Sequence, residues 1–357
     1  MDFERVKNVL AAAGQPSFRL KQVRQAFFVQ LVGSWGEASA LPADLRDLLT
    51  REVPLSSLAP VREVASQDGR TVKAVLSTGD GQVIETVLMR HEGGRRTVCV
   101  SSQVGCPMRC AFCATGRLGL ARNLTAEEIA DQVMHFARRL KAENLRVTNV
   151  VVMGMGEPMH NLDAVLAAIR ELNAPDGLGL GARHFSISTC GIIPGIERLA
   201  EEPLQINLAI SLHAATQELR ERLMPVAQAY PLDRLMAACR AYADKTNRKV
   251  MFEYLLLDGV NDSEEDADLL ADLMGNGLFH VNLIKYHATG AFRATPRERR
   301  EQFQAALERR GIPVTFRVSF GEDIAAACGQ LAAGGRKLQA ASKSVDSELA
   351  CPPSCPP

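Results

Sequence analysis

The chain has 357 residues, 46% of them hydrophobic, which is enough for one large domain and a small one. Lys plus Arg and Asp plus Glu both number 41, so net charge gives no sign of nucleic-acid binding and any basic surface must be local. The polar amino terminus is unlike a signal peptide, and no apolar run is long enough to span a membrane. We therefore expect a cytoplasmic protein without membrane contact. Its nine cysteines predict metal-binding or catalytic thiols rather than a secreted disulfide framework.

The first part of the chain has a helical pattern. Apolar residues recur at helical spacing between residues 20 and 31, so we expect a helical accessory domain over residues 1–58. Lys21 and Arg24 fall on its polar face and make it a candidate for RNA contact, although a solvated face is the commoner explanation of such residues.

Residues 59–91 change to a strand pattern. Two β-prone runs, 71–77 and 83–89, flank the turn at residues 79–81 and predict a β-hairpin extension. We expect the core of the protein to follow over residues 92–335, and the Ser-, Lys- and Pro-rich residues 336–357 to be a disordered tail. Cys351 and Cys355 lie in that tail, and we regard them as incidental thiols.

The core alternates strands with helices. Thr125 and Glu128 form a capping-box pattern that predicts a helix to about residue 143. The expected strands are 97–102, 147–153, 184–189, 206–211, 249–257 and 280–286, with 314–319 a candidate further strand. The expected helices are 125–143, 162–172, one after Pro194, 216–223, 232–246, 264–274 and 296–310. Six such units predict an α/β fold with a parallel sheet, a partial (β/α)6 TIM-like barrel.

One loop carries three closely spaced cysteines. Cys106, Cys110 and Cys113 have the spacing C-x3-C-x2-C, and Gly105 and Pro107 oppose a helix there, so the loop can direct the three sulfurs toward one point. Three thiolates are one short of a closed zinc site or the usual set for a 4Fe–4S cluster. A cluster held by three cysteines leaves one iron open to S-adenosylmethionine (SAM), and the spacing resembles the radical-SAM signature. The alternative is a zinc site with a distant fourth ligand.

Other polar residues follow the carboxyl ends of the predicted strands, where βα barrels place functional groups. The backbone of Gly156 and the carboxylate of Glu157 can approach the SAM amino group, and hydroxyl or imidazole groups can hold its ribose or carboxylate. Alone, each is a weak signal, and a lone barrel histidine is more often structural. Together they predict a SAM site formed by Gly156, Glu157, Ser188, Ser211, Leu212 and His213.

Two further thiols lie outside the cysteine loop. Cys99 falls inside the first core strand, and Cys328 follows an acidic, glycine-bounded turn. An ordinary buried thiol is the commonest fate of a free cysteine, and we assign Cys190 and Cys239 to that class. The glycine after Cys328 is unusual for core packing.

From about residue 18 to residue 332 the chain resembles the radical-SAM adenosine-carbon methyltransferases of the RlmN/Cfr group, somewhat nearer to Cfr. The motifs that carry the resemblance are residues 98–106, 112–116, 122–125, 154–158, 186–194, 211–213, 259–263, 280–284 and 323–331. His287 departs from the family pattern, which usually has a SAM-binding Asn there.

The resemblance implies a mechanism. A first SAM methylates Cys328, and a second SAM, bound to a 4Fe–4S cluster, yields a 5′-deoxyadenosyl radical that takes a hydrogen atom from the S-methyl group. The carbon radical adds to an adenine ring, Glu85 accepts the ring proton, and Cys99 attacks the Cys328 sulfur, forming a disulfide and releasing the base. Neither carbon 2 nor carbon 8 of adenine is nucleophilic, which explains the need for a radical step.

The expected substrate is adenosine carbon 2 or 8 in 23S ribosomal RNA or transfer RNA. The resemblance further implies an electron donor such as flavodoxin or ferredoxin, and we expect a monomer. Two alternatives stay open: a radical-SAM enzyme acting on a peptide or small molecule, and a non-catalytic RNA-binding metalloprotein.

Overall fold

The computed structural model describes residues 1–290 and 292–331; the predicted tail, with Cys351 and Cys355, lies outside the described residues. A ten-stranded sheet organises the chain, in the order β1-β2-β3-β4-β7-β8-β9-β10-β11-β12. Its first four strands pair antiparallel. They are β1 (Leu58–Ala65), β2 (Thr71–Thr78), β3 (Val83–Arg90) and β4 (Arg96–Val100). The predicted hairpin is therefore present, and β1 widens it to three strands.

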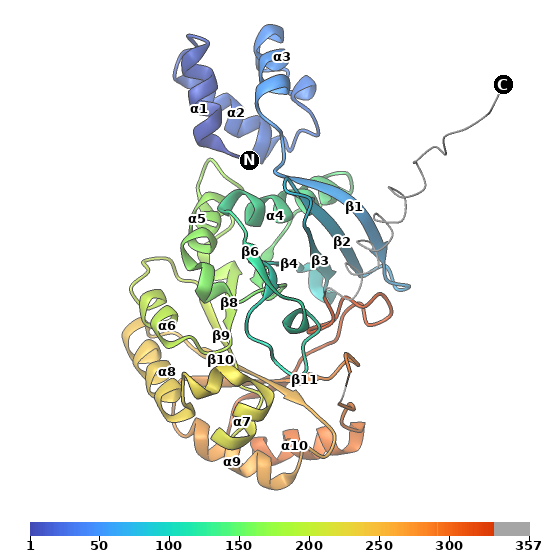
Figure 1. Ribbon diagram of the computed structural model, residues 1–357, viewed down its shortest axis with the longest axis vertical. Helices are drawn as coiled ribbons and strands as arrows, with labels where there is room; N and C mark the ends of the chain where they lie inside the picture. The colour runs from blue at the N-terminus through green and yellow to red at the C-terminus, as the bar shows by residue number, and fades with distance from the viewer. Residues whose placement is uncertain (291, 332–357) are drawn as a thin grey trace, which may run out of the picture.

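The remaining strands run parallel to β4. They are β7 (Asn149–Val152), β8 (Phe185–Thr189), β9 (Asn207–Ser211), β10 (Val250–Leu256), β11 (Phe279–Lys285) and the short β12 (Val314–Phe316). Helices lie around the outside of this sheet (Figure 1). They are α4 (Ala126–Lys141), α5 (Leu162–Asn173), α6 (Ile193–Leu199), α7 (Gln217–Leu223), α8 (Leu232–Thr246), α9 (Glu264–Met274) and α10 (Arg297–Arg309). The predicted α/β fold with a partial barrel is confirmed.

Short helices at the amino-terminal end form a separate layer above the barrel in Figure 1. They are α1 (Phe3–Ala12), α2 (Phe18–Arg24), the π-helix η1 (Gln25–Val29) and α3 (Ala43–Glu52). Arg24 forms ion pairs with Glu171 and Asp176 at and beyond the end of α5. Arg24 thus fastens these helices to the barrel, which removes it from the surface cations available to RNA.

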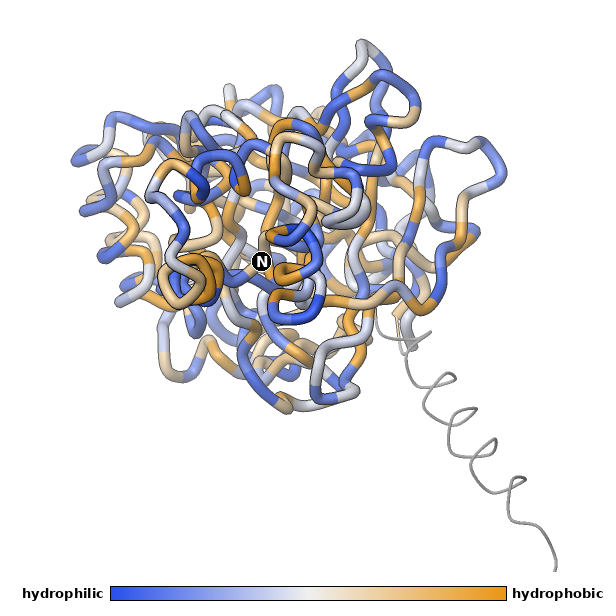
Figure 2. The backbone as a smooth tube through the Cα atoms, turned by 90° about the horizontal axis from the view of Figure 1, so that it is seen from above, coloured by the Kyte–Doolittle hydropathy of each residue, from blue (hydrophilic) through white to orange (hydrophobic). Residues whose placement is uncertain are grey.

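Hydrophobic residues concentrate in the segments that run through the interior, whereas the outer loops are largely hydrophilic (Figure 2). The core is continuous from the amino-terminal helices through the sheet to α10. Across the described ranges, no helix combines the length and the apolarity that crossing a membrane requires.

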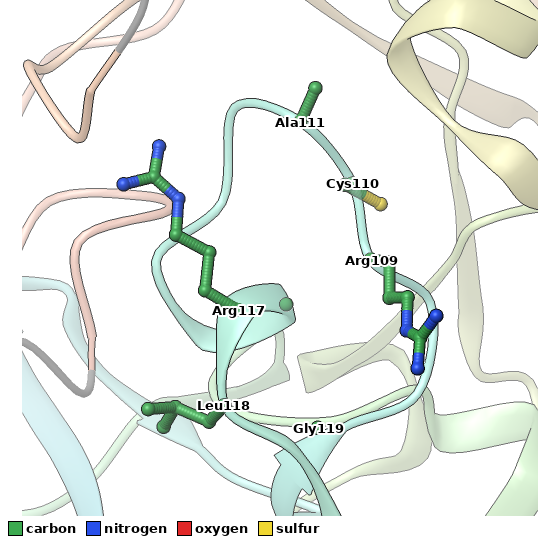
Figure 3. A pocket seen from close by; sticks show the side chains of 7 residues that line it. Arg109, Cys110, Ala111, Arg117, Leu118 and Gly119 are labelled. Atoms are coloured by element: carbon green, nitrogen blue, oxygen red, sulfur yellow. The ribbon is translucent and has the colours of Figure 1, made fainter.

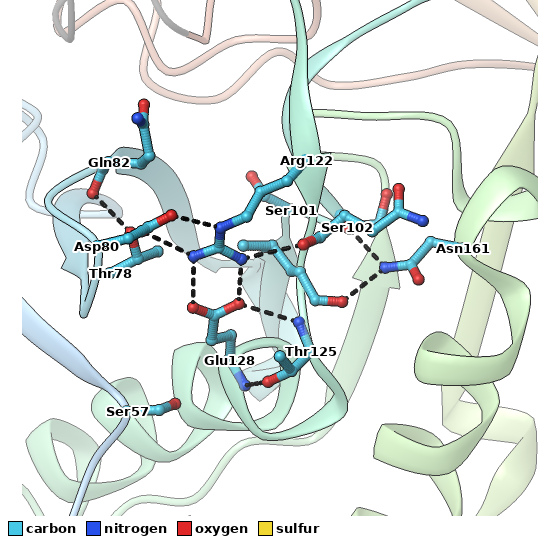
Figure 4. Close-up of polar contacts among 12 residues, drawn as sticks. Ser57, Thr78, Asp80, Gln82, Ser101, Ser102, Arg122, Thr125, Glu128 and Asn161 are labelled. Atoms are coloured by element: carbon cyan, nitrogen blue, oxygen red, sulfur yellow. Dashed lines mark hydrogen bonds and ion pairs between the residues drawn. The ribbon is translucent and has the colours of Figure 1, made fainter.

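Arg122 joins the hairpin extension to the barrel. It lies on β6 (Gly119–Asn123), which pairs with β5 (Gln103–Cys106) in a second, two-stranded sheet. Its guanidinium donates to Asp80, in the turn between β2 and β3, at 2.7 Å and to Glu128 of α4 at 2.8 Å (Figure 4). One side chain therefore sets the position of the hairpin relative to the first barrel helix.

The capping box of α4 gives a stability prediction. The Thr125 hydroxyl accepts from the Glu128 backbone N–H at 3.2 Å, and the Glu128 carboxylate accepts from the Thr125 N–H at 2.9 Å. Thr125→Ala removes the first bond and should lower the free energy of unfolding by about 1 kcal/mol. Thr125→Ser keeps the hydroxyl and should stay close to the wild type. Urea unfolding of the three proteins measures the difference, and equal midpoints for the Ala and Ser variants would contradict the assigned cap.

Candidate active site

The cysteine loop is the connection between β5 and β6. Gly105 has a φ of +80°, and a Cβ there would lie 1.9 Å from the carbonyl oxygen of Gly119, so only glycine fits where the two strands cross. Cys106 and Cys110 are buried and Cys113 is half-buried. Two backbone bonds hold the loop against distant segments: Ala111 N–H donates to the Leu223 carbonyl at 2.9 Å and Ala114 N–H to the Gly329 carbonyl at 2.8 Å.

The three thiols lie close enough to interact electrostatically. Burial, with smaller contributions from Cys110 and Cys113, raises the pKa of Cys106 to about 12. Within residues 1–290 and 292–331 no three His, Cys, Asp or Glu side chains have the geometry of a metal site, so the thiols share a loop without meeting at one point. This differs from the expected convergence, and the physical reason is that thiols close around an ion only when they exchange their protons for it.

The surroundings of the loop nevertheless fit an iron–sulfur cluster. A cavity of about 540 Å³ is lined by Cys110 and its neighbours, and Figure 3 shows Arg109 and Arg117 on opposite sides of the loop. A set of three cysteine ligands leaves one iron of a 4Fe–4S cluster open. Cys190, predicted to be an ordinary buried thiol, lies with its sulfur 3.9 Å from that of Cys110.

The carboxyl-terminal segment brings Cys328 beside this loop. In addition to the bond from Ala114 to Gly329, the Thr115 hydroxyl donates to the Leu331 carbonyl at 3.0 Å. Cys113 and Cys328 consequently line the same cavity, of about 490 Å³, which lies on the inner face of the sheet. Cys328 is exposed.

Cys99 lines that cavity too. Burial, and then the nearby Cys328 thiol, raise the pKa of the Cys99 thiol to about 12, so the two thiols interact electrostatically. The structure therefore gathers Cys99, Cys113 and Cys328, which the sequence places in three separate motifs.

A charged array forms another part of the cavity wall, and the sequence analysis missed it. Arg317 donates to Glu253 at 3.0 Å, and Asn282 donates to the other oxygen of Glu253, also at 3.0 Å. The pKa of Arg317 is raised, mainly by the negative charge of Glu253. Burial opposes this shift, and Cys328 and Cys99 add to it. The available signal was Glu253, a charged residue within the otherwise apolar strand β10.

Glu85 lies on β3, two residues from Val87, and β-strand alternation places both side chains on one face. Val87 lines the cavity and is directly opposite Cys99 in the β3–β4 register. The Glu85 side chain is 2% exposed and forms an ion pair with Lys73 of β2 at 3.2 Å. The proposed proton acceptor is thus buried near the two thiols that it would serve.

The six predicted SAM residues lie near the carboxyl ends of β7, β8 and β9 or just after them, along one rim of the barrel. Ser188 and Ser211, at the ends of β8 and β9, are half-buried with their hydroxyl oxygens 3.5 Å apart. A Cβ on Gly156 would lie 2.7 Å from the Gln103 side chain, so this glycine permits close packing of two rim loops. Among the described residues, the lining of the cavity with Cys328 includes Gly154 and Ser186 from these segments but none of the six.

Glu157 and His213 hold the rim together. Glu157 accepts from the backbone N–H groups of Met159 at 3.0 Å and Cys190 at 2.7 Å, and burial raises its pKa. Leu212 is fully buried, and its N–H donates to the Glu253 carbonyl. The Nδ1 atom of His213 accepts from Leu255 N–H at 3.0 Å, so His213 is neutral and supports the backbone.

His287 lines the cavity at the end of β11. Its Nε2 atom is 2.9 Å from the Ser319 hydroxyl and its Nδ1 atom is 3.4 Å from Glu322. Both partners belong to the segment that leads to Cys328. The histidine that replaces the family's usual Asn thus contacts the carrier segment.

Comparison with known proteins gives consistent matches. The sequence model of the radical SAM superfamily matches residues 100–271. The probable dual-specificity RNA methyltransferase RlmN of Geobacillus kaustophilus is 45% identical over 339 residues, covering 94% of this chain and 92% of the relative. That of Staphylococcus carnosus is 44% identical, covering 94% and 93%.

The chain belongs to the RlmN family of radical-SAM methyltransferases. A crystal structure of a radical SAM methyltransferase from Sphaerobacter thermophilus is 47% identical, with a TM-score of 0.90, and covers 93% of this chain and 98% of its own. The RlmN-type fold therefore extends over the amino-terminal helices, the hairpin and the barrel alike.

The neutral state of His213 gives a prediction on pH. Burial, and to a smaller extent the nearby Arg220, lower the pKa of His213 from 6.5 to about 3. Between these two values the unfolded chain binds a proton that the folded chain does not, so stability falls as pH decreases through that range. His213→Asn offers an amide oxygen to Leu255 without titrating, and its φ of +59° suits Asn. Urea unfolding between pH 4 and 7 should show a shallower acid loss in the variant; parallel curves would contradict the assignment.

Proposed function

We propose that this protein is a radical-SAM methyltransferase that adds a methyl group to carbon 2 or carbon 8 of an adenosine in RNA. The substrate is large-subunit 23S ribosomal RNA, with transfer RNA as a second class. Its cofactors are a 4Fe–4S cluster and two SAM molecules per turnover. The observation that carries the proposal is the single cavity lined by Cys99, Cys113 and Cys328.

We assign the cluster to Cys106, Cys110 and Cys113, and its SAM to the rim residues Gly156, Glu157, Ser188, Ser211, Leu212 and His213. When bound, the cluster and its SAM supply the one-electron chemistry that removes a hydrogen atom from a methyl group. Cys328, exposed at the mouth of the cavity, is the residue that accepts and carries this methyl group. The link through Ala114 and Gly329 keeps the carrier beside the cysteine loop.

Cys99 and Glu85 complete the reaction. Glu85 accepts the ring proton of the adenine attached to Cys328. Cys99 then attacks the Cys328 sulfur: the S–S bond forms as the bond from that sulfur to the methylene carbon breaks, and this carbon keeps the electron pair and takes up a proton, which gives the methyl group of the freed base. An attacking thiol must be a thiolate, and burial disfavours that form of Cys99. The positive charge of Arg317 opposes this effect.

The remaining assignments concern organisation and partners. We propose that residues 1–58 form an accessory domain that contacts RNA, that residues 59–91 form the extension, and that residues 92–335 form the catalytic core. Arg95, which lines the cavity, and the exposed Lys21 are candidate phosphate contacts. A flavodoxin or ferredoxin supplies the electron, and the enzyme acts as a cytoplasmic monomer.

The metal content tests the cluster assignment. Protein purified without air should be brown and contain iron and sulfide in near-equal amounts. Cys106→Ala, Cys110→Ala and Cys113→Ala should each lose this content, because a loop with two thiolates cannot hold the cluster. Cys239→Ala, on α8, is the matched control and should retain it. A colourless, zinc-containing wild type with full activity would exclude the assignment.

Replacing Cys328 and replacing Cys99 should block the reaction at different steps. Cys328→Ala has no methyl carrier, so it should give neither product nor a covalent link to RNA. Cys99→Ala can still attach the base but cannot release it, so a protein–RNA adduct should accumulate. A denaturing gel with labelled RNA, SAM and a reductant separates the two results. Equal behaviour of both variants, with no shifted band for Cys99→Ala, would remove the support for an S-methylcysteine intermediate.

A further inference from the structure

A buried cation connects the proposed base to the loop that carries Cys328. Lys73 lies on β2, with its side chain 7% exposed, and its Nζ atom is 3.2 Å from the Glu85 carboxylate. The same Nζ atom donates to the carbonyl oxygen of Ala325 at 3.0 Å. Ala325 is three residues before Cys328. One ammonium group therefore contacts both the proposed base, Glu85, and the loop that bears the proposed methyl carrier.

The sheet register sets this arrangement. Lys73 is directly opposite Val87 on β3, and Val87 is directly opposite Cys99 on β4. Directly opposed residues face the same side of a sheet, and residues two apart on a strand do so as well. Lys73, Glu85 and Cys99 therefore share one face, which is the face of the cavity.

The carrier loop lies against this face. Figure 1 shows the segment that ends at residue 331 beside β2 and β3, and the backbone N–H of Gln67, in the β1–β2 turn, donates to Asp323 at 2.8 Å. Ala325 has a φ of +51°, a conformation that residues other than glycine rarely adopt. The bond from Lys73 stabilises this disfavoured turn and so helps to set where Cys328 lies.

A buried ion pair is weak support for stability, because removing both charges from water costs about as much as their attraction returns. The position of this pair favours a role in catalysis. The Lys73 Nζ atom contacts both the Glu85 carboxylate and the carbonyl oxygen of Ala325, so it joins the proposed base to the segment that bears Cys328.

We propose that Lys73 is the positioning residue for proton removal: its ammonium group holds the Glu85 carboxylate and the carrier loop in a fixed position relative to each other. This inference rests on the proposed function of Glu85 and Cys328. In the step concerned, the C–H bond of the adenine ring breaks, its electron pair stays on the adduct, and the proton forms an O–H bond with Glu85. Lys73 keeps its protons throughout.

The test follows two half-reactions in the full-length, cluster-loaded enzyme. Lys73→Met should leave methylation of Cys328 within about twofold of the wild type, since that step needs no base and the bonds from Gln67, Ala114 and Thr115 still hold the segment that bears Cys328. Release of methylated RNA should slow by at least about tenfold, a part of the roughly 100- to 10,000-fold that a general base contributes, and the protein–RNA adduct should accumulate. Lys73→Arg, which retains the charge, should recover most of the release rate.

Other variants separate positioning from folding. Lys73→Gln keeps a hydrogen-bond donor but loses the charge, and it should accumulate the adduct as well. It can take the place of Lys73→Met if that variant is insoluble. In a Glu85→Gln background, Lys73→Met should add little further loss, because both act on one step. Arg90→Met is the matched control: it breaks the ion pair with Glu143 at 2.6 Å from the opposite face of β3 and should release product normally.

Three outcomes decide the matter. If Lys73→Met releases product as fast as the wild type, or loses Cys328 methylation and release together, the role of Lys73 is wrong. If the wild type itself forms neither S-methyl-Cys328 nor product, the proposed function fails independently of Lys73. Normal Cys328 methylation with a trapped adduct in Lys73→Met, and normal release in Lys73→Arg and Arg90→Met, supports the inference.

Discussion

The backbone hydrogen bond from Ala114 to Gly329, 2.8 Å long, is the constraint on which the rest of the site depends. It attaches the carboxyl-terminal segment to the cysteine loop, although the two are separated by nearly the whole barrel in sequence. The hydrogen bond from the Thr115 hydroxyl to the Leu331 carbonyl is a second link between the same two segments. Glu322, paired with Lys285 at 2.9 Å, anchors the same segment to β11. Cys328 is therefore exposed yet held from several sides.

Buried charges give the cavity its chemical character. Glu253 and Arg317 form one pair inside it, and Lys73 and Glu85 form another beside it. Such pairs are expensive to desolvate and contribute little net stability. Their position next to Cys99 and Cys328 is better explained by the need to place charge where protons and thiolates change state. The hairpin extension supplies one of the pairs, so under the proposed function it takes part in the reaction together with the barrel.

Much of the fold was predictable because local patterns and the barrel architecture agree. The helix expected over residues 264–274 is observed as Glu264–Met274, and the capping box at Thr125 begins α4 as expected. The β5–β6 pairing was not predicted, since its strands are short and the crossing at Gly105 depends on contact with Gly119. For the site, the sequence indicated which residues matter but not their contacts. Arg24, His213 and the Arg317 array show why: ion pairs and hydrogen bonds between distant segments leave no periodic signal.

The origin of the transferred carbon tests the central claim most directly. The enzyme would be supplied, over many turnovers, with SAM whose methyl group carries three deuterium atoms, and the RNA nucleosides would be analysed by mass spectrometry. Passage through Cys328 predicts a carbon-methylated adenosine with two deuterium atoms, because one is removed while the methyl group is on the sulfur. A product that retains all three would show direct transfer from SAM to the base and would contradict the account.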